Sequence, residues 1–164
     1  MKKIIGLVIG GIILIVIGTI YFKYVYVPKG MTYRIKYENL RKEVKGYAKE
    51  IVGELTDSGL HTRINFQKQE DSITYTFDIL NDGDIPAKLF HEPYIIGKDN
   101  ITKTYISRYL LYKDGSEIQK GDELKPGDKV TVEYKILYSE KELQTSPDGN
   151  HFEVTLFFPY LQNR

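Results

Sequence analysis

The chain of 164 residues contains no cysteine and no tryptophan. The lack of cysteine excludes disulfide bonds, cysteine-ligated zinc sites, thiol nucleophiles and lipid attachment at a cysteine. A domain outside the cytosol without disulfides is more typical of a prokaryote than of an animal cell surface. The net charge is only +1, whereas nucleic-acid binding normally needs a strongly basic face. We therefore expect no nucleic-acid partner.

Local catalytic motifs are missing as well. The sequence has no G-x-S-x-G, S-x-x-K or H-E-x-x-H pattern, and its glycines do not group ahead of a helix as a phosphate-binding loop requires. His61, His91 and His151 are too far apart for a local metal motif, and His91–Glu92 is the only adjacent acid–base pair. The sequence thus predicts no catalytic residue, no metal site and no cofactor, and we expect a protein that is not an enzyme.

Residues 4–22 form an uncharged run that follows Lys2 and Lys3 and ends at Lys23. As a helix, this run would span roughly 28 Å, close to the thickness of the hydrocarbon core. We predict a transmembrane helix over 4–22, a short cytoplasmic tail over 1–3 and a juxtamembrane linker over 23–31. A cleaved secretory signal is the alternative. However, the run is longer than such signals, and bulky residues stand where small ones are needed for cleavage.

The short tail and the absence of a second span favour a single-pass protein of the cell membrane with the N-terminus inside and residues 24–164 extracytoplasmic. Gly6 and Gly10 have the small-xxx-small spacing that lets two transmembrane helices approach closely. They predict a helix contact in a homodimer or in a larger membrane complex. The alternative is that glycine is simply common in membrane helices.

Residues 32–58 carry apolar side chains at a helical spacing, separated by charged residues. We predict a short amphipathic helix that packs on the domain that follows, with a coiled-coil seam between two protomers as the alternative. The residues of the stripe are Tyr33, Tyr37, Leu40, Val44, Tyr47, Ile51 and Leu55.

The apolar period then changes to two, which is typical of half-buried antiparallel strands. Alternation is clearest over 73–79, 130–138 and 152–158, and weaker strand candidates lie at 62–69, 87–96 and 105–112. Turn residues such as Asp114–Gly115 and Pro126–Gly127 separate these segments. Residues 60–164 are therefore predicted to form one antiparallel β-sandwich, so the fold class is mainly β.

Two segments carry a resemblance to a known family. Residues 74–87 read as a strand that ends in Asn-x-Gly with a small residue shortly after, and residues 124–134 read as leucine, Pro-Gly, an acid and an alternating strand. This pair resembles immunoglobulin-like surface modules of bacteria and archaea, especially CARDB-type adhesion-related domains. The resemblance implies an immunoglobulin-like sandwich at the cell surface and carries over no functional residue.

Aromatic residues are dense in one third of the predicted sandwich, and tyrosine supplies contact area at small entropic cost. This density predicts a binding patch, although some of these rings should fill the core instead. Its residues are Phe90, Tyr94, Tyr105, Tyr109 and Tyr112.

Two further sites are candidates. The acidic turn from Asn81 to Asp84 offers oxygen ligands for calcium, but these residues also suit a tight turn, which is the interpretation that we favour. Asn100 begins an Asn-Ile-Thr sequon and is a candidate glycosylation site.

We expect a membrane-anchored, extracytoplasmic binding or structural protein that presents its sandwich to a protein or an envelope polymer. The alternatives are an accessory subunit of a membrane complex, an envelope hydrolase whose carboxylates converge only in the fold, and a pilin-like subunit. The acidic residue expected early in the apolar run of bacterial pilins is missing.

Overall fold

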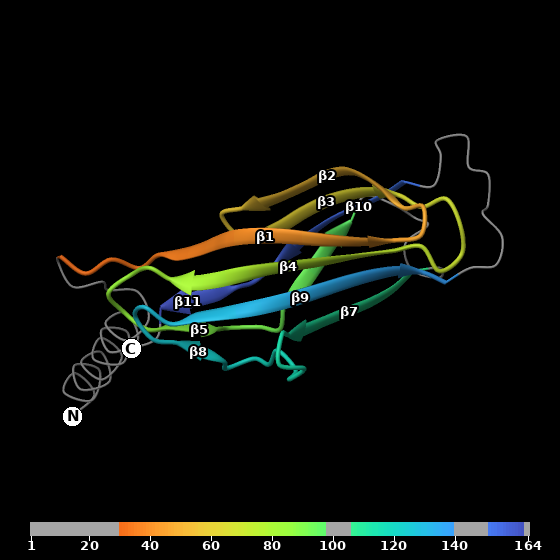
Figure 1. Ribbon diagram of the computed structural model, residues 1–164. Coiled ribbons are helices and arrows are strands. Elements are labelled where there is room, and N and C mark those ends of the chain that lie inside the picture. The colour runs from red at the N-terminus through yellow and green to blue at the C-terminus, as the bar shows by residue number, and fades with distance from the viewer. Residues whose placement is uncertain (1–29, 98–105, 140–150, 163–164) are drawn as a thin grey trace, which may run out of the picture.

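A computed structural model describes residues 30–97, 106–139 and 151–162. Within these ranges the chain forms eleven β-strands and no helix (Figure 1), so the predicted mainly-β class is confirmed. The strands are β1 (Ile35–Lys45), β2 (Lys49–Thr56), β3 (Gly59–Asn65), β4 (Ser72–Asn81), β5 (Ala87–Leu89), β6 (Tyr94–Gly97), β7 (Ile106–Tyr112), β8 (Glu123–Leu124), β9 (Lys129–Tyr138), β10 (His151–Phe157) and β11 (Tyr160–Gln162).

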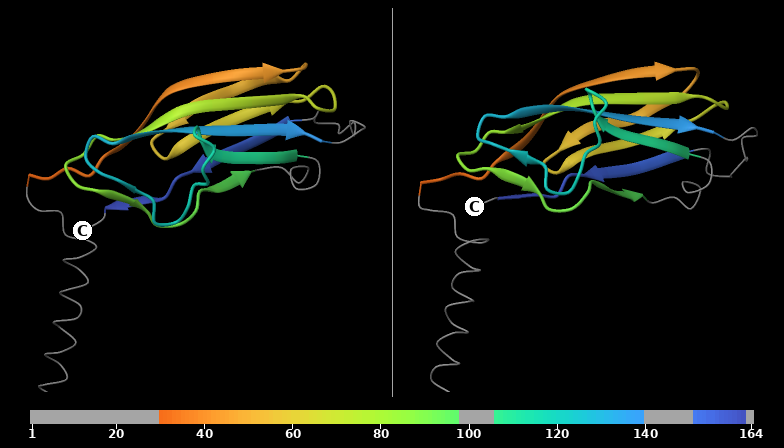
Figure 2. Two further views of the ribbon diagram at one scale, coloured as in Figure 1. Left: turned by 60° about the horizontal axis from the view of Figure 1, so that its bottom comes forward. Right: turned by 90° about the horizontal axis from the view of Figure 1, so that it is seen from below.

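The described strands form three antiparallel sheets. Sheet A has the order β1-β4-β9-β7, sheet B has the order β2-β3-β10-β6, and the small sheet C has the order β11-β5-β8. Sheets A and B lie face to face, and sheet C continues the molecule at one end (Figure 1, Figure 2). The arrangement is a β-sandwich-like fold.

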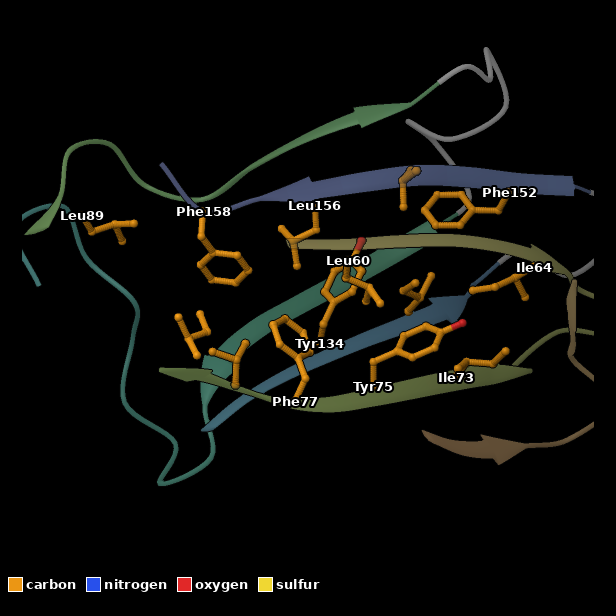
Figure 3. Close-up of a cluster of buried hydrophobic side chains, with 14 of the residues drawn as sticks. Leu60, Ile64, Ile73, Tyr75, Phe77, Leu89, Tyr134, Phe152, Leu156 and Phe158 are labelled. Atoms are coloured by element: carbon orange, nitrogen blue, oxygen red, sulfur yellow. The ribbon is translucent and has the colours of Figure 1, made fainter. Parts of the chain in front are cut away.

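The core lies between sheets A and B (Figure 3). Ile73, Tyr75 and Phe77 on β4 have no exposed surface and point toward strands of sheet B. Phe158, just after β10, meets Phe77 edge-on with a ring-centroid distance of 5.9 Å. Because inward and outward residues alternate along each strand, the segments predicted from period-two patterns supply this core.

The predicted amphipathic helix over 32–58 is wrong, because these residues form β1 and β2. A β-bulge in β1, where Asn39 has a φ of 58°, shifts the register between Glu38 and Arg41. The extra residue brings Tyr37 and Leu40, three apart in sequence, against the same core, and so imitates a helical spacing. Long-range pairing of β1 with β4 overrides the local pattern.

Three further residues of the predicted helical stripe do not face the core. Val44, Tyr47 and Ile51 are 43%, 62% and 48% exposed and do not continue an apolar face. The sandwich therefore begins with β1 and not near residue 60 as predicted.

No helix that could cross a bilayer occurs among residues 30–97, 106–139 and 151–162. The predicted cytoplasmic tail over 1–3, the predicted span over 4–22 and residues 23–29 of the predicted linker lie outside these ranges.

The described chain starts and finishes at the same end of the molecule. The segment that leads into β1 and the strand β11 both lie at this end, which we call the near end (Figure 1, Figure 2). The turn between β1 and β2 lies at the opposite end, which we call the far end (Figure 1). Any segment that precedes residue 30 therefore joins the sandwich at the near end.

Candidate functional site

The last strands of the two large sheets lie on the same side of the molecule. β1 and β2 begin the strand orders of sheets A and B and contact each other, so β7 and β6, which finish these orders, lie on the other side. Four large apolar side chains on these two strands are exposed. Tyr94 and Ile96 point outward from sheet B, and Tyr109 and Leu111 point outward from sheet A. We call the edge formed by β6 and β7, with these side chains on either side of it, the β6–β7 side.

Pairing with β10 fixes the orientation of Tyr94 on β6. Tyr94 is opposite Phe157 in the register, and their rings stack with centroids 5.3 Å apart and an interplanar angle of 19°. Tyr94 is nevertheless 48% exposed, and Ile96 two residues later is 56% exposed. This part of the surface is a preformed apolar area, because stacking on Phe157 holds the Tyr94 ring in place.

On β7, alternate residues face opposite ways. Leu110 and Tyr112 pack against the core, whereas Tyr109 is 53% exposed on the outer face of sheet A. A shallow hollow of about 540 Å³ runs beside this strand, and it is mostly polar. Among the residues that line it are Glu92, Arg108, Tyr109, Leu111, Glu117 and Lys120. Both signs of charge therefore border the exposed tyrosine.

β7 also offers backbone groups at its outer edge. The Tyr112 N–H donates to the Ser116 carbonyl at 2.9 Å, so Tyr112 directs its backbone away from β9. Alternate residues of an antiparallel strand direct their backbone groups to the same edge, which places those of Arg108 and Leu110 there too. At its end this edge is covered by an isolated antiparallel β-bridge between Leu111 and Glu117, which engages the backbone of Leu110 and Tyr112. Among the described residues, only Arg108 is left without a backbone hydrogen bond at this edge. An extended chain could add there as a further strand.

The predicted aromatic patch is split by the fold. Tyr94 and Tyr109 lie on the β6–β7 side, and Phe90, 51% exposed, lies beside sheet C. Tyr112 is half-buried, and its hydroxyl donates to Asp122 Oδ2 at 2.7 Å. Burial, with Tyr160 and Asp122 nearby, raises the pKa of Tyr112 above its usual value. Tyr105 is outside the described residues, as are Gly6, Gly10 and the Asn100 sequon.

Half-buried tyrosines tie the start of the described chain to the segment that ends in β11 at the near end. The Tyr33 hydroxyl donates to the Tyr160 carbonyl at 2.6 Å, and the Tyr37 hydroxyl donates to the Phe158 carbonyl at 3.3 Å. Burial, and to a lesser extent Tyr160, raises the pKa of Tyr33 to about 12. These phenols are therefore neutral at physiological pH, and they fasten the residues after the linker to the sandwich.

The acidic turn after β4 has internal partners for each of its polar side chains. Asn81 donates to the carbonyls of Ile85 and Leu124 at 2.8 and 2.9 Å, and its Oδ1 accepts the Gly83 N–H. Asp82 forms ion pairs with Arg34 and Lys36 at 2.5 Å each. The described residues contain no group of three or more acidic or histidine side chains placed to hold a metal ion.

Asp84 completes this arrangement, because its Oδ2 accepts the Thr32 N–H at 3.1 Å. The turn joins the segment before β1 to the segment after β4. These contacts are the ones expected from the turn-forming interpretation of the sequence.

One polar cluster was not predicted from the sequence. On the outer face of sheet B, His61 lies between two carboxylates, with Nδ1 3.4 Å from Glu54 Oε1 and Nε2 3.3 Å from Glu153 Oε1. Arg63 is 3.9 Å from Glu153. Both ring nitrogens of His61 face an acceptor, and none of these side chains lines a described hollow. Glu54, His61 and Glu153 occupy outward positions on three neighbouring strands. The sequence could have indicated this cluster only if the pairing of these strands had been known.

The β6–β7 side combines exposed aromatic rings, mixed charge and a strand edge that is open at Arg108, and is the candidate functional site. Its chemistry is that of recognition, since exposed tyrosines and backbone groups supply contact area and hydrogen bonds. No protein-family model, curated protein or solved structure matches this chain.

Proposed function

We propose that this chain is a single-pass membrane protein whose sandwich binds a protein or an envelope polymer through the β6–β7 side. The observation that carries the proposal is that both strands of this edge expose large apolar side chains, Tyr94 and Ile96 on β6 and Tyr109 and Leu111 on β7. Exposed apolar groups concentrated in this way mark interaction surfaces.

The anchoring part of the proposal rests on the uncharged run over 4–22, which has the length of a transmembrane helix. With the N-terminus inside, the sandwich is extracytoplasmic and works at the cell membrane. Gly6 and Gly10 would then serve to pack the anchor against a second copy or against helices of a larger complex.

We also propose that the sandwich is immunoglobulin-like. An immunoglobulin constant domain has the sheets ABED and CFG. Here β1, β4, β9 and β7 correspond to A, B, E and D, and β6 and β10 correspond to C and F. The place of strand G is taken by β3, which comes earlier in the chain, with β2 beyond it. The strand order supports this assignment, and the β2–β3 hairpin is the departure from the usual plan.

Recognition would combine two contributions. Tyr94 and Tyr109 supply aromatic contact area, and the outer edge of β7 supplies backbone hydrogen bonds to an extended segment of the partner. Tethering to the membrane confines the sandwich near its partner and so raises the effective concentration. No step of this mechanism requires a catalytic group, and we propose no enzymatic activity.

Site-specific photocrosslinking in intact cells tests the proposal. A photoreactive phenylalanine analogue replaces Tyr94 or Tyr109 in the full chain, and Tyr47 at the far end is the matched control because it is also an exposed tyrosine at 62%. We expect positions 94 and 109 to capture the same partner and position 47 to capture none of it.

A second variant removes exposed apolar side chains of the β6–β7 side and keeps the photoreactive analogue. With the analogue at position 94, the substitutions Tyr109→Ser and Leu111→Ser should abolish capture, because both side chains are exposed and contribute little to the core. Equal capture at all three positions, or capture that survives the double substitution, would contradict recognition through the β6–β7 side.

A further inference from the structure

Sheet C has one face in the core and one face in solvent. Leu89 and Tyr160 are paired across β5 and β11 and are buried, at 0% and 7% exposed. The next pair along, Lys88 and Leu161, therefore points outward. Both side chains are exposed, and Leu161 retains 50% of its surface.

An apolar centre with two cations lies on this outer face. Phe90 and Leu161, each about half exposed, line a shallow hollow of about 150 Å³ together with Lys88 and Lys120. The Lys120 ammonium group lies 5.8 Å from the centre of the Phe90 ring. We call these four residues the basic apolar patch.

Backbone hydrogen bonds hold the patch in shape. The Phe90 N–H donates to the Pro159 carbonyl at 2.9 Å, which fixes Phe90 beside β11. The Gly121 N–H donates to the Leu89 carbonyl at 2.8 Å, and this keeps the loop with Lys120 against β5. Gly121 has a φ of +102°, a conformation that favours glycine and that lets its backbone reach the Leu89 carbonyl.

Acidic groups border the patch but do not fill it. Glu123 is opposite Lys88 in the register of β5 and β8, and Glu92 lies with Lys120 in the hollow beside β7. The hollow of the patch itself is lined by no acidic residue and is mainly apolar. Exposed apolar anchors flanked by lysine suit an interface between anionic headgroups and acyl chains.

The position of the patch identifies the surface that it can reach. Sheet C extends from the near end, where the described chain begins at Gly30 (Figure 1). Seven residues, 23–29, separate Gly30 from the apolar run, and seven residues can span at most about 25 Å in any conformation. If the run is anchored as proposed above, the near end stays close to the headgroups.

We propose that the basic apolar patch docks on the membrane that anchors the chain. Phe90 and Leu161 enter the interfacial layer, and Lys88 and Lys120 contact anionic lipid headgroups. This inference rests on the proposed membrane anchoring and adds a second, reversible contact that orients the sandwich relative to the bilayer.

The absence of tryptophan gives a direct test, because a single introduced tryptophan is the only indole in the protein. The full chain with Phe90→Trp is reconstituted in phosphatidylcholine–phosphatidylglycerol vesicles whose acyl chains carry bromine, a quencher of tryptophan emission. Tyr47→Trp at the far end is the matched control. We expect blue-shifted emission for Phe90→Trp and quenching at least twofold stronger than for Tyr47→Trp.

The lysines are tested in the Phe90→Trp background. Each lysine near an anionic surface contributes a factor of about five to docking, so Lys88→Gln with Lys120→Gln should lower the docking equilibrium about 25-fold. Replacing phosphatidylglycerol by phosphatidylcholine should have a similar effect. Equal quenching with and without the lysines or the anionic lipid would overturn the proposal.

Other outcomes separate this proposal from the anchoring on which it depends. Unquenched Phe90→Trp in protein that stays with the vesicles after an alkaline wash overturns the docking and leaves the anchor intact. Loss of the protein from the vesicles in that wash refutes the anchor and with it the docking. A blue shift that disappears when the protein is diluted in the bilayer shows contact with a second copy and also contradicts docking.

Discussion

Replacement of Asp71 by asparagine should destabilise the sandwich strongly although the two side chains have nearly the same shape. Asp71 is 2% exposed and lies between β3 and β4 at the far end. Its Oδ1 accepts the Tyr47 N–H at 2.8 Å, and its Oδ2 accepts the N–H groups of Gln67 and Lys68, also at 2.8 Å. One carboxylate therefore joins the β1–β2 turn to the loop that precedes β4.

The expected loss follows from the number of acceptors. An asparagine side chain has a single acceptor oxygen, and its best orientation keeps the bonds to Gln67 and Lys68 while its NH₂ group faces the Tyr47 N–H. Hydrogen bonds to a charged group contribute about 1.5–3 kcal/mol each, and a buried donor without a partner costs a further ~1–3 kcal/mol. We expect a loss of roughly 2–4 kcal/mol in the free energy of unfolding, because some relaxation is possible at a turn.

Thermal unfolding of the full chain in mild detergent, followed by near-ultraviolet circular dichroism of the tyrosines, measures this loss. For a domain of this size, 2–4 kcal/mol corresponds to a fall in Tm of about 10 °C. Asp114→Asn is the matched control, because Asp114 accepts hydrogen bonds from Ser116 in an exposed turn. A fall in Tm for Asp71→Asn no larger than that for Asp114→Asn would refute the reasoning.

Two further predictions concern sheet A. Phe77→Ala should lower the free energy of unfolding by about 3–5 kcal/mol, because Phe77 is fully buried and its removal leaves a cavity. Thermal unfolding measures this loss, and a much smaller loss would show that the core collapses around the cavity. Burial alone would raise the pKa of Asp78, but hydrogen bonds from Thr131, Asn39 and Lys129 outweigh it and leave this pKa below its usual value. The unfolded chain therefore binds the proton more readily, so the stabilising contribution of Asp78 is present above about pH 4 and is lost as the pH falls through the lowered value. Asp78→Asn should make Tm fall less steeply as the pH drops below about 4. The same pH dependence of Tm in Asp78→Asn and in the unchanged protein would contradict a lowered pKa for Asp78.

The strands that could be predicted from the sequence are those with one face in the core. Ile73, Tyr75 and Phe77 alternate with polar residues because only every second side chain of β4 points between the sheets. The helix predicted over 32–58 is wrong because a bulge at Asn39 adds a residue to β1 and breaks the alternation. A bulge is visible only once the partner strand is known, and the partner β4 lies more than thirty residues away in sequence.

The candidate site was only partly predictable for a related reason. Tyrosine is common both in the core and on the surface, and the sequence cannot tell Tyr75 and Tyr134, which are fully buried, from Tyr94 and Tyr109, which are about half exposed. The distinction depends on which face of which sheet each position occupies. It also depends on strand order, because β6 and β7 form one side only when both sheets are assembled.

The fold itself separates two surfaces with different chemistry. The β6–β7 side offers aromatic rings and a strand edge, and suits a protein or polymer partner. The basic apolar patch on sheet C, beside the near end, suits a bilayer. A single anchor with a docked sandwich would present the first surface in a fixed orientation. The tyrosine contacts at the near end suit this arrangement, because they hold the segment around Tyr33 and Tyr37 against the sandwich.

Alkaline extraction of membranes from cells that produce the full chain tests the central claim most directly, because it removes peripheral proteins and leaves proteins that span the bilayer. The account predicts that the intact chain, with its N-terminal residues still attached, remains in the membrane pellet. Release of the chain into the supernatant, or a mature polypeptide that begins after Gly18, would contradict it.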